Sequence, residues 1–281
     1  MEIFKQIAPL KIFVEGIKRS GKTIGLVPTM GALHRGHISL IEASKSQNTV
    51  TVASIYVNPT QFNNPLDLQK YPKTTEKDLE MLEKAGCDAV FSPNDDEMYP
   101  EASILKFEFG SLDKVMEGKY RPGHFSGVAL VVSKLFNIIE PHNAYFGQKD
   151  WQQFAIIRQL VAELKFNLVL SNIPIQRESD GLAMSSRNLR LNETQRVHAT
   201  IFYHALVMAR GALKGGKEIE AVKKAVTEMV NQKPEMRLEY FELANSKNLN
   251  ILDNLDNAIV PILCIAGYAG EVRLIDNMFL D

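Results

Sequence analysis

The chain has 281 residues, 45% hydrophobic and 23% charged, with a formal net charge of −1. These values are typical of a soluble globular protein with one large or two smaller domains. The charge leaves no basic excess for nucleic acid or an acidic membrane surface. No apolar run reaches about 18 residues, and the N-terminus lacks a signal-peptide pattern. Cys87 and Cys264 lie far apart, so we expect buried thiols and a cytoplasmic protein.

Helices and strands alternate along the first part of the chain. Leu10, Phe13, Val14 and Ile17 have helical spacing, which predicts a first helix at 10–20. Further helices are predicted at 36–45, 74–86, 127–141 and 150–164, and strands at 24–29, 50–58, 88–93, 105–110, 143–147 and 167–175. This alternation predicts an α/β, doubly wound (Rossmann-like) domain with a parallel sheet over residues 1–174.

The pattern changes after residue 174. Two helical stretches, 194–213 and 219–232, precede strand candidates at 237–244, 258–269 and 271–277. Helices followed by strands predict a smaller α+β domain over residues 175–281.

The stretch GIKRSGKT, residues 16–23, matches the phosphate-binding P-loop pattern. A working P-loop follows a strand and opens a helix, so that amide groups point at the phosphates. Here a predicted helix precedes the glycines and a strand follows them. We therefore interpret the stretch as a helix-to-strand turn, where helix carbonyls would repel phosphate.

The stretch PTMGALHRGH, residues 28–37, has the order that a phosphate site needs: strand, glycine-containing turn, helix start. His34 and His37 flank the predicted helix start, beside backbone N–H groups that we expect to be free for a triphosphate. Their N–H donors suit the charge that grows on an attacked phosphorus. The motif alone leaves two other interpretations open: a metal site, for which no third ligand has suitable spacing, and ordinary surface histidines.

HRGH resembles the HxGH signature of the nucleotidyltransferase superfamily. The closest resemblance is to the pantoate–β-alanine ligase family, through VPTMGALHRGH, IYVNPTQF, YPKT, RPGHFSGV, FGQKDWQQ and DGLAMSSRN, in order across residues 27–188. The resemblance implies ATP-dependent condensation of (R)-pantoate with β-alanine through a pantoyl adenylate, releasing AMP and pyrophosphate and forming the coenzyme A precursor pantothenate. It also implies a homodimer, Mg²⁺ bound mainly through the ATP phosphates, and no metal ligands from the protein.

The same resemblance assigns residues to roles. The catalytic residues would be His34, His37 and Lys149, with His37 the proton donor in the activation step. ATP would be bound by Met30, Gly31, His34, His37, Gly147, Gln148, Lys149, Asp150, Gln176, Met184, Ser185, Ser186 and Arg187. Pantoate would be bound by Met30, Asn58, Gln61 and Gln153, and β-alanine by Gln61. The second domain would close over the ATP site.

Some roles stay open. Asp150 would bind the ribose or cap its own helix, His124 would belong to the site or to a structural turn, and the loop at 58–73 would serve as a lid or only as a connection. Two other functions also compete. One is AMP transfer to a phosphorylated acceptor, although the acceptor pocket would offer glutamines rather than cations. The other is nucleotide binding without catalysis, which would not need His34, His37 and Lys149.

Overall fold

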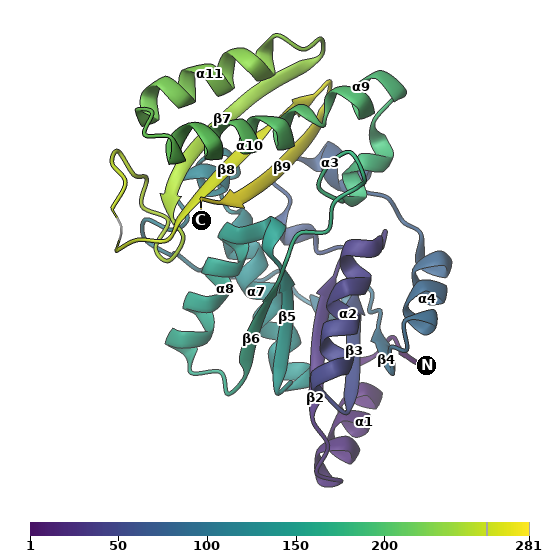
Figure 1. Ribbon diagram of the computed structural model, residues 1–281. Helices are drawn as coiled ribbons and strands as arrows, with labels where there is room; N and C mark the ends of the chain where they lie inside the picture. Colours follow the sequence, from purple (N-terminus) through teal and green to yellow (C-terminus); the bar gives the residue numbers. More distant parts are fainter. Residues whose placement is uncertain (257, 281) are drawn as a thin grey trace. The chain divides into compact units, whose positions relative to one another are not determined.

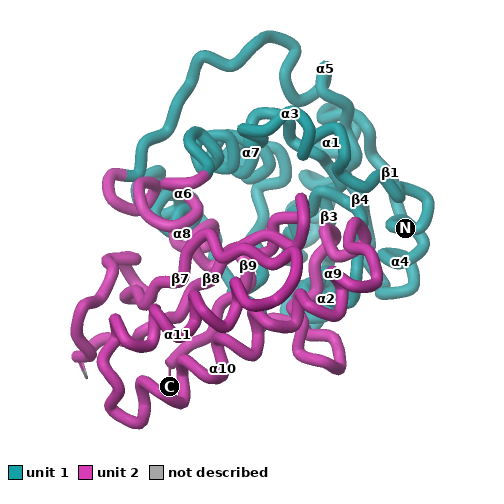
Figure 2. Tube along the Cα trace, turned by 90° about the horizontal axis from the view of Figure 1, so that it is seen from above, with its two compact units in different colours: residues 1–109, 121–148, 156–174 teal, residues 110–120, 149–155, 175–281 magenta. Residues whose placement is uncertain are grey.

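The structure, a computed structural model, describes residues 1–256 and 258–280, which form two compact units (Figure 2). Unit 1 consists of Met1–Phe109, Arg121–Gln148 and Ile156–Pro174. Unit 2 consists of the described residues of Gly110–Tyr120, Lys149–Ala155 and Ile175–Asp281. Unit 2 therefore includes two short segments from the first part of the chain.

Unit 1 is built on a six-stranded parallel sheet with the order β1-β4-β3-β2-β5-β6. The strands are β1 (Glu2–Phe4), β2 (Ile24–Thr29), β3 (Val50–Ile55), β4 (Ala89–Phe91), β5 (Asn143–Gly147) and β6 (Val169–Ile173). Every residue of β3 is buried, as expected for a strand of a parallel sheet whose two faces are covered by helices. The predicted doubly wound α/β fold is confirmed, and β1 is a strand that the sequence patterns did not indicate.

The helices of unit 1 lie on both faces of this sheet. They are α1 (Ile7–Arg19), α2 (Arg35–Gln47), α3 (Pro65–Gln69), α4 (Thr75–Lys84), α5 (Asp95–Met98), α7 (His124–Ile139) and the later part of α8 (Trp151–Leu164), with a short 3₁₀ turn η1 (Pro59–Gln61). The connections β2-α2-β3 and β4-α7-β5 cross the sheet in opposite directions, and right-handed crossovers then place α2 and α7 on opposite faces. Figure 1 shows α2 in front of the strands and α7 behind them.

The stretch GIKRSGKT forms the end of α1 and the turn into β2. Gly21 has φ 72°, Gly21 N–H donates to the Lys18 carbonyl over 2.9 Å, and Lys22 N–H donates to the Ile17 carbonyl over 3.3 Å. These two bonds are the Schellman motif that ends a helix. The interpretation as a helix-to-strand turn is confirmed.

The predicted edge strand at 105–110 is wrong. Described residues 101–109 have no helix or strand, and the side chains of Ile104 and Leu105 are 92% and 65% exposed. The Phe107 N–H donates to Ser126 Oγ over 2.9 Å instead of to a neighbouring strand. Alternation of apolar residues favours an extended backbone, but a strand also needs a partner.

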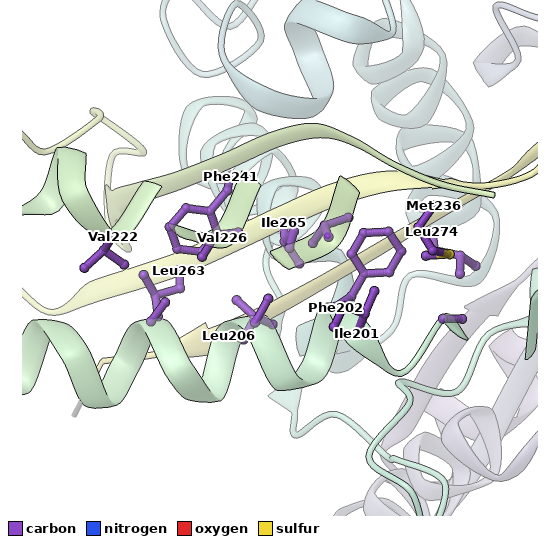
Figure 3. Close-up of a cluster of buried hydrophobic side chains, with 14 of the residues drawn as sticks. Ile201, Phe202, Leu206, Val222, Val226, Met236, Phe241, Leu263, Ile265 and Leu274 are labelled. Carbon is purple, nitrogen blue, oxygen red and sulfur yellow. The ribbon is translucent and has the colours of Figure 1, made fainter. Parts of the chain in front are cut away.

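Unit 2 contains an antiparallel sheet of three strands, β7 (Met236–Asn245), β8 (Pro261–Ala269) and β9 (Val272–Phe279), in that order. Helices α10 (Ile201–Lys214) and α11 (Ile219–Asn231) cover one face, preceded by α9 (Glu193–His198). Figure 3 shows the core between them, in which Phe202 and Leu206 of α10 lie near Leu263 and Ile265 of β8. The predicted smaller α+β domain is confirmed as a fold class.

The other face of the antiparallel sheet buries a second cluster. Ile262, Cys264 and Ala266 alternate along β8 with the residues of the first core, as side chains of a strand must. Met116 of α6 (Met116–Tyr120) and Ala155 of α8 complete this cluster. The need to cover this second apolar face explains why 110–120 and 149–155 belong to unit 2.

Both cysteines are buried free thiols, as the sequence predicts. Burial raises the pKa of the Cys87 thiol to about 11 and also raises the pKa of Cys264. Among the described residues, no helix combines the length and the apolar character that crossing a membrane requires.

A buried ion cluster ties α6 to the antiparallel sheet. Arg273 donates to Glu117 through both terminal nitrogens over 2.7 Å, and its Nε donates to Glu239 over 2.9 Å. Tyr240 also donates to Glu117 over 2.8 Å. The side chains of Glu117 and Glu239 are only 9% and 10% exposed, so each carboxylate depends on the guanidinium for its charge partner.

Replacing Arg273 by Met should lower the stability of the protein by about 3–5 kcal/mol, because two buried carboxylates lose their cation. The measurement is the midpoint of thermal unfolding. Arg196→Met is the matched control, since the Arg196–Asp180 pair is 33% and 42% exposed and should contribute at most about 1 kcal/mol. Equal effects of the two changes would show that the buried cluster is no more important than a surface pair.

Candidate active site

The strand order of unit 1 reverses between β2 and β5. From β2 the chain proceeds through β3 to β4 on one side, and from β5 to β6 on the other. In doubly wound sheets, ligands bind beyond the carboxyl ends of the strands at such a reversal. Met30 follows β2 directly, and Gly147 ends β5. The sheet of unit 1 therefore brings the HxGH turn and the start of the FGQKD motif to the same edge.

A buried carboxylate shapes the turn that follows β2. Asp78, in α4, is 1% exposed and accepts hydrogen bonds from the amides of Ala32 over 2.9 Å and Leu33 over 2.8 Å. Gly31 donates its amide to Thr29 Oγ1 over 3.2 Å. The backbone has φ 78° at Gly31 and φ 48° at Ala32. Asp78 thus compensates a turn that is unfavourable for a residue with a Cβ atom.

His34 and His37 form the N-terminal cap of α2. His34 precedes the helix with extended backbone, and its Nδ1 accepts the Gly36 N–H over 3.1 Å. His37 Nδ1 in turn accepts the His34 N–H over 3.3 Å, so the pair forms a reciprocal capping box. The two ring centroids are 4.1 Å apart. The motif therefore builds the helix start as well as carrying candidate donors.

The expectation of free amides at this helix start is wrong for two residues. The Gly36 N–H is used by the His34 ring, and the His37 N–H donates to the His34 carbonyl over 2.8 Å. The cause is that a side chain at the cap competes for the same amide groups as a ligand would. The imidazoles, rather than these two amides, remain the candidate phosphate donors.

The cap also fixes the proton of each ring. A backbone amide can only donate, so Nδ1 of His34 and Nδ1 of His37 must both be acceptors. A neutral imidazole carries one proton, which therefore lies on Nε2 in both histidines. Each ring consequently presents an Nε2–H donor, the form that can stabilise negative charge on a phosphate oxygen.

Three of the predicted pantoate residues lie together in unit 1. Gln61, in η1, is 7% exposed, and its Nε2 donates to Met30 Sδ over 2.9 Å. Asn58 is 1% exposed and donates to Gln61 Oε1 and to the Gly127 carbonyl, both over 3.1 Å. Asn58 Oδ1 accepts from Tyr99 Oη over 2.9 Å, and burial raises the pKa of the Tyr99 phenol. Asn58 therefore orients the side-chain amide of Gln61.

Gly147 lies at the carboxyl end of β5, where it pairs with Ile173 of β6. A Cβ atom added at Gly147 would meet no protein atom within 4 Å. Packing therefore does not explain this glycine, whereas the close approach of a ligand to the backbone would. Gln148 follows it and opens the 3₁₀ turn η2 (Gln148–Asp150).

In unit 2, the structure brings Gln176 beside Met184. The Gln176 carbonyl accepts the Met184 N–H over 3.0 Å, and Arg177 and Ala183 form an antiparallel bridge. The hairpin turns at Gly181, with φ 91°, where a Cβ atom would lie 2.1 Å from the Tyr203 ring. Glycine in the DGLAMSSR motif is therefore required for the hairpin itself.

The serines that follow this hairpin open a short 3₁₀ helix, η3 (Ser186–Arg190). Ser185 caps it, since its hydroxyl accepts the Arg187 N–H over 3.3 Å. Ser186 is 7% exposed, and Asn188 Nδ2 donates to the Ala183 carbonyl over 3.1 Å. The SSRN sequence is thus a capped turn that continues the hairpin.

Three side chains attach the segment that carries Lys149 and Gln153 to the rest of unit 2. Asn277 Nδ2 donates to the Lys149 carbonyl over 2.9 Å. Trp151 Nε1 donates over 3.0 Å to a carbonyl between β7 and β8. Gln152 donates to two carbonyls just before α6 over 2.7 and 2.9 Å. The backbone on which Lys149 and Gln153 are mounted is therefore held at several points.

A small cavity in unit 2 joins Lys149 to the serine loop. It is lined by Lys149, Leu182, Ala183, Ser185, Asn188, Phe202, Leu274, Ile275 and Asp276. Arg177 donates two bonds to the Asp276 carboxylate, over 2.6 and 3.0 Å. Burial raises the pKa of Asp276, and the Arg177 guanidinium opposes this shift. Parts of Lys149 and Ser185, two predicted phosphate-binding residues, thus lie close together in unit 2.

The sequence patterns did not identify the residues that support this site. Asp78 lies within an ordinary amphipathic helix pattern, and nothing nearby distinguishes it from a solvated carboxylate. No sequence pattern distinguishes Gln152 from its more exposed neighbour Gln153. The polar pair Asp276 and Asn277, near the end of a predicted strand, was a usable signal. The structure buries both side chains, at 5% and 3% exposure. Among the described residues, no group of three His, Cys, Asp or Glu side chains is placed to hold a metal ion.

The sequence matches the family model described as Pantoate-beta-alanine ligase over residues 2–279. It is 50% identical over 278 residues to a pantothenate synthetase of Porphyromonas gingivalis, which covers 99% of each chain. It is 48% identical over 275 residues to a pantothenate synthetase of Cytophaga hutchinsonii, covering 98% of this chain and 97% of the relative.

Solved structures agree with this match. The pantothenate synthetase of Thermus thermophilus superposes with a TM-score of 0.93 at 37% identity, covering 100% of this chain and 99% of the other. The pantoate-beta-alanine ligase of Francisella tularensis, solved in complex with beta-gamma ATP and beta-alanine, gives 0.83 at 36% identity, covering 100% and 98%. With similarity of this extent along the whole sequence, the chain belongs to the pantoate–β-alanine ligase family.

Proposed function

We propose that this chain condenses (R)-pantoate with β-alanine to form pantothenate, the coenzyme A precursor, at the expense of ATP. Family membership over residues 2–279 carries the proposal. A carboxylate is a poor acylating agent, so the pantoate carboxylate first attacks the α-phosphorus of ATP and pyrophosphate leaves. The β-alanine amine then attacks the acyl carbon of the pantoyl adenylate, loses a proton, and AMP leaves.

The first step needs donors around the phosphate oxygens, and His34 and His37 supply them in this proposal. Both rings carry their proton on Nε2 in the neutral form, because the helix cap uses both Nδ1 atoms. Donors that are already oriented stabilise the growing charge without reorganising during the reaction. We assign the proton donor of the activation step to His37.

Unit 2 supplies the cationic and hydroxyl groups for the phosphates. Lys149 and Ser185 lie close together in unit 2, and we assign both to the α-phosphate and the leaving pyrophosphate. Ser186 and Arg187 follow in the capped turn, and Arg187 offers a planar fork for phosphate oxygens.

We also assign residues to the rest of the nucleotide. Met30, Gly31, Gly147, Gln148 and Asp150 would contact ATP, and Met184 would do so beside Gln176, whose backbone would face adenine. A glycine at 147 that packing does not require is consistent with a nucleotide lying against β5. Unit 2 would close over the ATP site, and the part of the 58–73 loop that follows Gln61 would serve as a lid or only as a connection.

Pantoate would be bound by Gln61 and Gln153, with Met30 shaping the pocket and Gln61 also contacting β-alanine. Amide groups suit a substrate with hydroxyls and a carboxylate, because they donate and accept without adding charge. Asn58 has its polar atoms occupied by Gln61, Gly127, Thr60 and Tyr99. Its contribution to pantoate binding would therefore come mainly through Gln61.

Mg²⁺ would enter on the ATP phosphates, where it neutralises their charge. Two buried free thiols suit a reducing compartment, which supports a cytoplasmic location.

Purified protein given ATP, pantoate and β-alanine should release AMP and pyrophosphate in equal amounts with pantothenate. Without β-alanine, pantoate alone should support exchange of labelled pyrophosphate into ATP, because the adenylate forms reversibly. The readouts are product chromatography and the exchange assay. Release of ADP, or absence of pantoate-dependent exchange, would exclude the proposed reaction; tight ATP binding without turnover would favour a binding protein.

His37→Ala should lower kcat by about 10²–10³-fold, as the loss of one oriented transition-state donor does. Because His37 also caps α2, thermal unfolding of the variant must show that it remains folded. Lys22→Ala is the matched control: Lys22 is an exposed cation in the P-loop-like stretch, and its loss should leave kcat unchanged. Near-normal turnover of His37→Ala would remove this histidine from the mechanism.

A homodimer is proposed from the family resemblance. Sedimentation equilibrium of the purified chain should then give about twice its mass of 31.5 kDa. A mass equal to that of one chain at micromolar concentration would contradict the proposal.

A further inference from the structure

The segment RPGHFSGV, residues 121–128, has no role in the reaction described above, although His124 within it is buried. His124 is the first residue of α7, directly after Gly123 with φ 81°, and its side chain is 5% exposed. Its Nδ1 lies 2.8 Å from the backbone carbonyl of Gln61. A carbonyl oxygen can only accept, so Nδ1 of His124 carries the proton and donates.

Gly127 makes this contact sterically possible. A Cβ atom at Gly127 would lie 2.3 Å from the Thr60 carbonyl oxygen and 2.7 Å from Gln61 Cα. The first turn of α7 therefore packs directly on the backbone of η1. His124 and Gly127 are three residues apart, which places both on the side of α7 that faces η1.

The side-chain amide of Gln61 is oriented by a second set of contacts. The Gly127 carbonyl must accept and the Thr60 N–H must donate, so these two groups fix which way the Asn58 amide lies. Asn58 then offers its NH₂ group to Gln61 Oε1. Gln61 is left with its own NH₂ group toward Met30 Sδ, a weak acceptor that a substrate oxygen would replace with gain.

We propose that His124 is a positioning residue, which holds the backbone of Gln61 so that its side-chain NH₂ group is presented to an oxygen of pantoate. The inference rests on the proposed role of Gln61. Two anchors, His124 on the main chain and Asn58 on the side chain, restrict Gln61 before the substrate arrives. Restricting a binding group in advance reduces the entropy lost when the ligand binds.

Loss of the His124 anchor should therefore weaken binding of pantoate, which Gln61 contacts, and leave binding of ATP unchanged. In His124→Ala, the KM for pantoate should rise by about 10-fold, while the KM for ATP should stay within about twofold. His124→Asn should restore the pantoate KM to within about threefold of the unchanged protein, because the Asn amide nitrogen can occupy the place of Nδ1. Steady-state kinetics with each substrate varied in turn gives these values.

His198→Ala is the matched control. His198 lies in α9 of unit 2, and its Nδ1 makes the same kind of contact, 3.1 Å from the Pro234 carbonyl. Removing it should leave both KM values unchanged, whatever its effect on the thermal midpoint. A loss of folding alone cannot imitate the expected split between the two substrates, because unfolded protein lowers kcat without changing KM.

Combining His124→Ala with Gln61→Ala tests the route of the effect. If His124 acts through the Gln61 side chain, the double variant should have the same pantoate kcat/KM as Gln61→Ala alone, within about twofold. Multiplicative effects, no rescue by Asn, or equal changes in the KM for ATP and for pantoate would overturn the inference. Unchanged protein that fails to release AMP would instead refute the proposed function, so the two failures are distinguishable.

Discussion

The turn between β2 and α2 is held by the carboxylate of Asp78, and the positions of both HxGH histidines depend on that anchor. The chain passes through positive φ at Gly31 and again at Ala32, where a side chain makes this conformation costly. Two charge-assisted bonds to buried amides compensate this cost. Because Asp78 comes from α4, the packing of α4 against α2 sets the direction in which the chain enters His34.

Local sequence patterns predicted the features of unit 1 that depend only on neighbouring residues in the chain. Alternating strands and helices gave the parallel sheet, and the order of helix and strand around Gly21 separated a true phosphate turn from one with only matching letters. The edge strand at 105–110 failed because alternation contains no information about a pairing partner. The amides of Gly36 and His37 were expected to be free because the sequence does not show that the His34 side chain competes for the cap.

Which segments belong to unit 2 depends on the second apolar face of its sheet, which no local sequence pattern describes. Its antiparallel sheet has two apolar faces, and α10 and α11 cover only one of them. Met116 and Ala155, from distant parts of the chain, cover the other. This is why Lys149, two residues after the end of β5, has its carbonyl bound by Asn277 of β9. The resemblance could name Lys149, but the residues that hold it were visible only after folding.

Three histidines show how the neighbouring backbone determines which ring nitrogen carries the proton. Amide groups face Nδ1 of His34 and His37, so both rings must carry their proton on Nε2. A carbonyl faces Nδ1 of His124, so this ring must carry its proton on Nδ1. The difference follows from position: amides in the first turn of a helix have no carbonyl one turn earlier in the helix to bind, whereas the carbonyl of Gln61 ends a short 3₁₀ turn. The nearest main-chain group therefore decides which ring nitrogen of a neutral histidine carries the proton.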